Sequence, residues 1–149
     1  LKIGALIDRM GKANFVFPAA ALFVIGLVLV YFADTNLIFF AVAALITIAG
    51  YGLLMIMLNA AVRDFTPEDK AGQLQGVRMI FAVLIPMITG PRIAAKLTET
   101  FASAQYLNEY GIMVDIPAPH IYLGAAATGI FIIIPLIFLR REWKKVETK

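Results

Sequence analysis

Polar and charged side chains interrupt one long apolar stretch, residues 67–97, at positions that share one face of a regular α-helix. These side chains are Gln75, Arg78, Thr89 and Arg92, and steps of three and four residues keep them together. A guanidinium in such a place can bind an anionic group or gate an aqueous path, whereas turning it to lipid is costly. The spacing therefore predicts a helix whose polar face points to protein or to water.

Snorkelling offers a second explanation for the two arginines, and it stays open. Arg78 and Arg92 each lie near an end of the apolar run, where a long side chain can reach the membrane surface. Snorkelling does not explain why both share a face with Ala82 and Thr89. In the same stretch, Pro86 removes a backbone donor in mid-helix, which predicts a kink there.

The preceding apolar stretch, residues 37–62, carries a second set of polar side chains. Tyr51 and Asn59 recur on one broad helical face, and Gly50 and Gly52 thin the helix beside Tyr51. Inside a membrane, Asn and Tyr side chains hydrogen-bond either to neighbouring helices or to a ligand. Both explanations are open for each residue, and the second makes Tyr51 and Asn59 candidates for the wall of a cavity.

The overall composition restricts the class of protein. Hydrophobic residues make up 61% of the chain and its mean hydropathy is +0.86, which predicts an integral membrane protein rather than a soluble domain. The chain has no cysteine and one histidine, which argues against disulfide frameworks and against thiolate or histidine metal sites. Basic residues cluster beside apolar runs, a pattern of membrane orientation. We therefore expect no cofactor, no metal and no nucleic-acid partner.

The apolar runs predict an all-α integral membrane fold with four transmembrane helices. The expected helices are residues 15–32, 37–62, 67–97 and 121–139. The first and the last are almost uniformly apolar, so we expect them in outer, supporting positions. We expect the polar segment 98–120 to form an outside loop with a short helix at residues 101–110 and a surface histidine, His120. Residues 140–145, including Trp143, are expected to form a basic anchor at the membrane surface.

Basic residues gather on one side of the membrane if the four spans alternate in direction. That side carries Lys2, Arg9, Lys12, Arg63, Lys70, Arg78, Arg140, Arg141, Lys144, Lys145 and Lys149, and the opposite side carries Arg92 and Lys96. Because basic residues mark the cytoplasmic loops, we expect both termini in the cytoplasm. The expected location is the plasma (inner) membrane, with the lipid bilayer as the surrounding partner.

A compact charged motif precedes the first span. It reads Gly4-x-Leu6-x-Asp8-Arg9-x-Gly11-Lys12. A plain explanation is a solvated loop in which Gly11 supplies a turn. The pattern also resembles the loop signature of the major facilitator superfamily, which lies on the cytoplasmic side between the second and third spans and recurs between the eighth and ninth. The family usually continues with a further basic residue, whereas this chain continues with Ala13 and Asn14.

The resemblance implies a fold and a function for the whole chain. The four spans would correspond to spans nine to twelve of a twelve-span secondary transporter, in which spans ten and eleven contribute to the cavity. The implied partners are the preceding helices of the same transporter and a small-molecule substrate moved by alternating access, with symport as one expected mode. The implied conformational latch consists of Gly4, Asp8, Arg9, Gly11 and Lys12. The implied cavity-facing residues are Tyr51, Asn59, Gln75, Arg78, Thr89 and Arg92.

The sequence does not fix the transported substrate, the coupling mode or the class of protein. Residues 63–76 resemble a cytoplasmic loop of sugar and glycoside permeases, which would imply a polyhydroxylated substrate. No carboxylate is embedded in the four spans, so uniport, proton coupling and sodium coupling stay open. The alternative class is a small four-span scaffold or accessory subunit that transports nothing. An enzyme would need a nucleophile with a base, a carboxylate pair or a metal cluster, and none is visible in the sequence.

Overall fold

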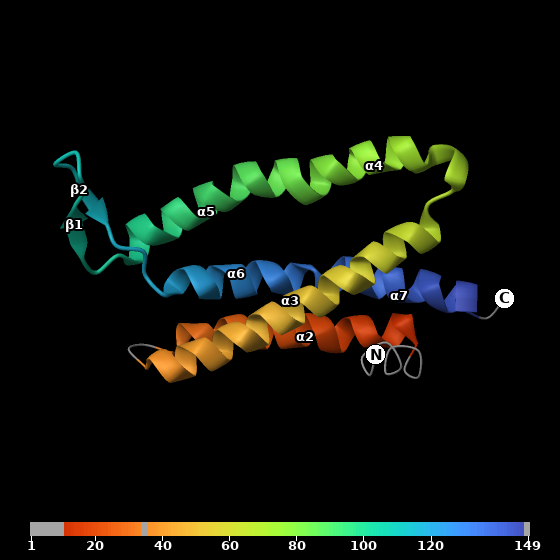
Figure 1. The fold of residues 1–149 in the computed structure, drawn as a ribbon, viewed down its shortest axis with the longest axis horizontal. Coiled ribbons are helices and arrows are strands. Elements are labelled where there is room, and N and C mark those ends of the chain that lie inside the picture. Colours follow the sequence, from red (N-terminus) through yellow and green to blue (C-terminus); the bar gives the residue numbers. More distant parts are fainter. Residues whose placement is uncertain (1–10, 34–35, 148–149) are drawn as a thin grey trace. The chain divides into compact units, whose positions relative to one another are not determined.

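The computed structural model describes residues 11–33 and 36–147, and helices make up most of this part of the chain (Figure 1). The α-helices are α2 (Lys12–Tyr31), α3 (Leu37–Phe65), α4 (Ala71–Met79), α5 (Ile85–Phe101), α6 (His120–Phe131) and α7 (Ile133–Glu147). A 3₁₀ turn, η1 (Glu68–Lys70), precedes α4, and a π-helical turn, η2 (Ile80–Leu84), joins α4 to α5. Two short strands, β1 (Gln105–Leu107) and β2 (Met113–Asp115), follow α5.

Four helical stretches are long and apolar enough to cross a membrane. They are Asn14–Tyr31, Leu37–Phe65, Glu68–Phe101 and His120–Lys145. A helix satisfies its own backbone hydrogen bonds, which is the requirement that lipid places on a spanning segment. The all-α membrane fold predicted from the apolar runs is therefore confirmed. Contacts divide the chain into two units, one holding α2, α3 and α7 and the other running from Phe65 to Gly124.

The hydrophobic core of the first unit lies where α2, α3 and α7 meet. Its buried members are Phe15, Val16, Ala19, Ala20, Leu54, Met57, Ala61, Leu136 and Trp143. The set combines three alanines with larger side chains, so the three helices can approach closely while the larger side chains fill the space between them. The core is thus concentrated near the start of α2 and the end of α3.

Two glycines bring α2 and α3 into backbone contact. A methyl group placed on Gly26 would lie 2.7 Å from the backbone of Thr47, and one placed on Gly50 would overlap the backbone of Phe23. Neither neighbour is a flexible side-chain end, so both positions require glycine for the observed distance. Gly50 therefore thins the helix as its sequence context predicts, whereas Gly52 faces open space in the structure.

The third span contains a wide helical turn that its sequence periodicity does not reveal. The backbone N–H of Ile85 donates to the carbonyl of Ile80, a bond five residues back instead of four. Pro86 follows at once, and a proline ring inside a helix clashes with the carbonyl four residues earlier, which here belongs to Ala82. Widening the preceding turn relieves that clash. The irregularity expected at Pro86 thus takes the form of a π turn before it.

The fourth span is also interrupted. α6 ends at Phe131 and α7 begins at Ile133, with Ile132 between them. Pro135 has no N–H with which to bond the carbonyl of Phe131, four residues earlier. The backbone instead closes with bonds from Ile132 to Gly129 and from Leu136 to Ile132. The apolar run predicts one regular helix here, and the proline accounts for the difference.

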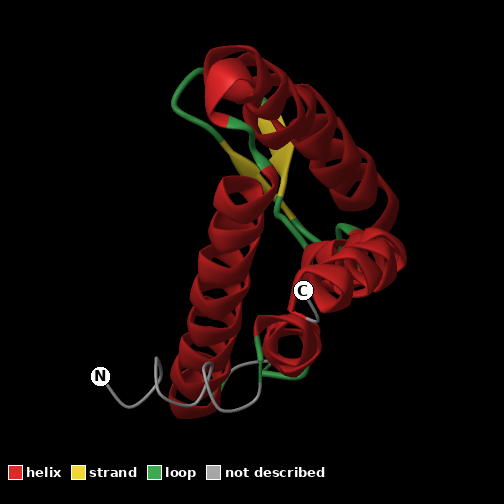
Figure 2. Cartoon of the chain, turned by 90° about the vertical axis from the view of Figure 1, so that its right-hand side faces the viewer, coloured by secondary structure: helices red, strands yellow, loops and turns green. Residues whose placement is uncertain are grey.

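The segment after α5 forms a β-hairpin, so the short helix expected at residues 101–110 was wrong (Figure 2). The strands are antiparallel, with Gln105 opposite Asp115 and their side chains joined by a 2.7 Å hydrogen bond. The Asn108 side chain accepts N–H groups of the turn, and Gly111 has φ 72°, which favours glycine. Local turn chemistry therefore outweighs helix propensity here.

His120 packs against the end of the third span instead of lying as an ordinary surface residue. Its ring is stacked on the ring of Phe101, with centroids 4.3 Å apart and planes 8° from parallel. Phe101 is the last residue of α5 and His120 the first of α6. The stacked pair therefore ties together the two ends of the segment that contains the hairpin.

Candidate functional site

The charged motif before the first span falls mostly outside the described residues. Gly4, Asp8 and Arg9 lie there, so their latch role stays a prediction. Gly11 is described, with φ 77° and ψ 139°, and its carbonyl accepts the N–H of Phe15 as α2 begins. A positive φ favours glycine at this position. α2 begins at Lys12, so the last residue of the motif is also the first residue of the helix.

Tyr51 and Asn59 lie on α3 away from the face that this helix buries. The buried residues of α3 are Ala43, Gly50, Leu54, Met57 and Ala61. Tyr51 remains 50% exposed, and Asn59 is also exposed. The tyrosine ring packs against the ring of Phe23 in α2, with centroids 5.9 Å apart and ring planes inclined by 48°. Tyr51 therefore contributes to helix packing and still presents surface, so both explanations offered by the sequence retain a basis.

The polar face predicted along the third span is divided by the π turn. An α-helix advances by about 100° per residue, and one i→i+5 turn inserts an extra residue. Residues after η2 are therefore rotated by about 100° relative to an uninterrupted helix. Arg78 and Arg92, expected about 40° apart, come to lie about 140° apart. The expectation of a single polar face was wrong, because it assumed a regular α-helix throughout.

The division produces two polar groups on the third span. Gln75 and Arg78 lie on α4, before the π turn, and Thr89 and Arg92 lie on α5, after it. None of the four is buried. The hydroxyl of Thr89 donates to the carbonyl of Ile85 at 2.9 Å. Thr89 can therefore accept a hydrogen bond from a ligand, but its own proton is already used.

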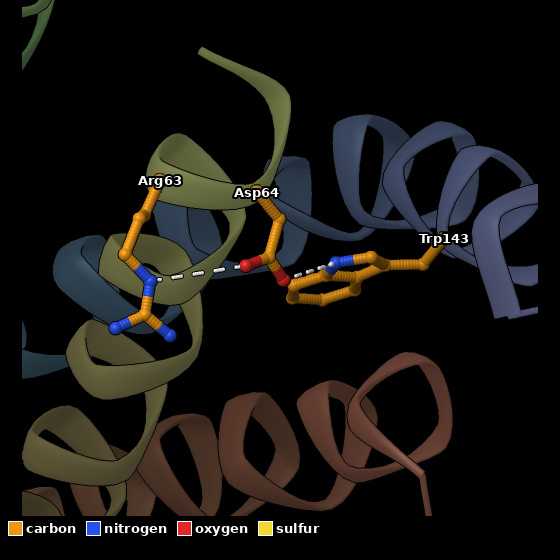
Figure 3. A network of polar contacts seen from close by, with 3 residues as sticks. All are labelled: Arg63, Asp64 and Trp143. Carbon is orange, nitrogen blue, oxygen red and sulfur yellow. Dashed lines mark hydrogen bonds and ion pairs between the residues drawn. The ribbon is translucent and has the colours of Figure 1, made fainter. Parts of the chain in front are cut away.

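A polar contact that the sequence pattern does not predict joins α3 to α7 (Figure 3). The indole Nε1–H of Trp143 donates to Oδ2 of Asp64 at 3.3 Å, and Oδ1 of Asp64 lies 3.8 Å from Nε of Arg63. Trp143 is only 2% exposed. It therefore belongs to the core and not to a surface anchor, which corrects that expectation.

A sequence signal for this burial exists in retrospect. Trp143 follows Leu136 by seven residues, a spacing that places both on one helical face. Leu136 is likewise 2% exposed. Because α7 continues to Glu147 without a break at the charged residues, its apolar face extends past the end of the expected span. The basic residues around Trp143 masked this continuation.

Arg140 of α7 is held by two residues of α2. Its Nη2 donates to Oδ1 of Asn14 at 3.0 Å, and its guanidinium carbon lies 5.4 Å from the centre of the Phe17 ring. The second contact has the geometry of a cation–π interaction. These two contacts tie the second half of α7 to the start of α2.

The comparisons with known proteins give one match. A family model described as the Major Facilitator Superfamily matches residues 1–149. Neither the search of curated proteins nor the search of solved structures returned a match. The matched region includes all four membrane-length helices and both polar groups of the third span. The chain therefore belongs to the Major Facilitator Superfamily, a family of membrane transporters.

Proposed function

We propose that this chain forms spans nine to twelve of a twelve-span secondary transporter, which moves a small solute across the membrane by alternating access. The main observation behind the proposal concerns the third span, Glu68–Phe101. It is long and apolar enough to cross a bilayer, yet its most apolar stretch has no buried residue, and the span carries Arg78 and Arg92. Charges at membrane depth require protein or water around them. Helices of the same transporter would supply that surrounding.

Two of the four spans would line the transport pathway. On α3, Tyr51 and Asn59 present polar surface outside the buried face. On the third span, Gln75 and Arg78 would face water near one end, and Thr89 and Arg92 would line the pathway beyond the π turn. Hydroxyl and amide groups suit a polyhydroxylated solute, and a guanidinium suits an anionic group. The opening motif supports the same assignment through Asp8 and Arg9, as a latch between transporter halves.

The orientation follows from the distribution of charge. Arg140, Arg141, Lys144 and Lys145 follow the last apolar segment, and basic residues are retained on the cytoplasmic side. We therefore place both ends of the chain in the cytoplasm and the protein in the plasma membrane. Symport is the proposed mode, with the coupling group outside these four spans, since no carboxylate is embedded in them.

The coding sequence upstream of this chain tests the assignment. About eight further apolar runs, and a second copy of the opening motif between the second and third of them, are expected. Solute uptake into vesicles that contain the intact protein tests transport itself. A coding sequence limited to four spans, together with no uptake of any tested solute, would favour the alternative of a scaffold or accessory subunit.

A further inference from the structure

A basic pocket opens between the start of α2 and the charged half of α7. Its volume is about 330 Å³, and it is lined by Phe17, Ile137, Arg140, Arg141 and Lys144. Three of the five lining residues are cationic and the other two are apolar. The volume falls at the lower end of the range for small-molecule sites, about 300–1,000 Å³. Such a pocket is matched to a group with negative charge at one end and hydrocarbon at the other.

The pocket lies where α7 changes from apolar to charged sequence. The residues before Arg140 are Ile-Phe-Leu, and α7 has five further charged positions after it. In a spanning helix this change marks the boundary between hydrocarbon and headgroups. Ile137 therefore lies at the depth of the lipid acyl chains. Lys144, about two turns further along the helix, lies at the depth of the lipid headgroups. A soluble anion without a hydrocarbon chain would gain nothing from contact with Phe17 and Ile137, the apolar residues of the pocket.

One wall of the pocket is already ordered. Arg140 is held by Asn14 and lies over the Phe17 ring, so its guanidinium loses little further freedom when a ligand binds. The neighbouring acid, Glu142, forms an ion pair with Lys145 and so does not compete for the pocket cations through that contact. The cationic lining of the pocket, its depth in the membrane and the fixed position of Arg140 therefore all favour binding of an anionic amphiphile.

We propose that this pocket binds the headgroup of an anionic phospholipid, with the phosphate between Arg140, Arg141 and Lys144 and the glycerol and upper acyl chain against Phe17 and Ile137. Basic pockets at the cytoplasmic end of membrane helices favour such lipids over zwitterionic ones. A bound lipid would bridge α2 and α7, which form the core of the first unit together with α3.

Native mass spectrometry of the intact protein in detergent tests the proposal, with added phosphatidylglycerol or phosphatidylcholine. We expect the protein to retain phosphatidylglycerol preferentially. Arg141→Gln and Lys144→Gln should each weaken this retention about fivefold. Lys145→Gln is the matched control: it removes the same charge from the same helix, but its ammonium pairs with Glu142. We expect less than a twofold change for it.

Three other results would contradict the proposed lipid site. Equal retention of the two lipids would exclude a site for anionic headgroups. An equal loss for Lys145→Gln would indicate attraction to a charged surface and no defined pocket. Glycerol 3-phosphate has the headgroup chemistry without acyl chains, so it should not displace the lipid; displacement at comparable concentration would assign the pocket to a soluble phosphate. Arg140 is left unchanged because it also holds Asn14.

Discussion

The indole of Trp143 donates its hydrogen bond to Asp64, a residue 79 positions earlier in the chain. Asp64 lies in the last turn of α3, and Trp143 lies in the second half of α7. The bond closes the polar end of a core that is otherwise apolar, and the carboxylate keeps its second oxygen near Arg63. This pair fixes the end of α3 against the second half of α7.

Substitution of Trp143 tests the strength of that connection. Trp143→Phe keeps most of the apolar ring but removes the donor, so unfolding free energy should fall by about 1 kcal/mol. Trp143→Ala also leaves a cavity, and the fall should reach about 3–5 kcal/mol. Thermal unfolding of the purified protein in detergent measures both. Arg63→Gln is the control, since its side chain is 79% exposed; a loss as large as that of Trp143→Ala would contradict the assigned core.

The glycine contacts between α2 and α3 give a second prediction. Gly50→Ala places a methyl group on the backbone of Phe23, so the helices must separate, at a cost of about 1–3 kcal/mol. Gly52→Ala is the control two residues away, where nothing lies within 4 Å. Alanine is the better helix former, so this change should be neutral or slightly stabilising. Equal destabilisation by the two variants, measured by thermal unfolding, would be incompatible with the close approach at Gly50.

The π turn before Pro86 predicts a change of helical register. Pro86→Ala restores a donor and removes the ring, so the third span should return to a regular α-helix and the residues beyond it should rotate by about 100°. Cysteine at Thr89 should then lose its reactivity toward water-soluble thiol reagents, and cysteine at Ile88 should gain it. Transport should fall at the same time, because the polar residues beyond the turn leave the pathway.

Pro91→Ala controls for the loss of a proline as such. Pro91 lies inside α5, and the residues of α5 that precede it, from Ile85 onward, are regular α-helix, so replacing Pro91 should leave the reactive positions where they are. An unchanged pattern in Pro86→Ala would mean that the wide turn does not depend on this proline. Reactivity at Met87, with Thr89 and Arg92 silent, would remove the cavity assignment altogether.

The opening motif gives a prediction about transport rate. If Asp8 acts as a conformational latch, Asp8→Asn in the intact protein should slow transport while expression stays nearly normal, because a neutral amide weakens an ion pair that one state of the transporter needs. Asp69→Asn is a suitable control, since Asp69 is an exposed acid in η1. Initial uptake rates in vesicles provide the measurement, and unchanged kinetics for Asp8→Asn would remove the latch role.

The sequence by itself determined the membrane class and the four helical segments. Long apolar runs such as residues 37–62 leave no other solution in lipid, where each backbone group must be satisfied within its own helix. The sequence also identified the family through the motif that ends at Lys12, and the match over residues 1–149 confirms it. These features depend on local composition and on short spacing, which one sequence displays directly.

Tertiary structure decided the features that rest on irregular or distant partners. The 3.6-residue period could not show the wide turn at Ile80–Leu84, and that turn separates Arg78 from Arg92. Trp143 looked like a surface anchor because its sequence neighbours are charged, and only the approach of α3 from far along the chain supplied the apolar core and the carboxylate that bury it. Whether a side chain is buried depends on which helices pack against its own helix. Contacts between segments distant in the sequence determine this packing, and the local sequence of one helix does not.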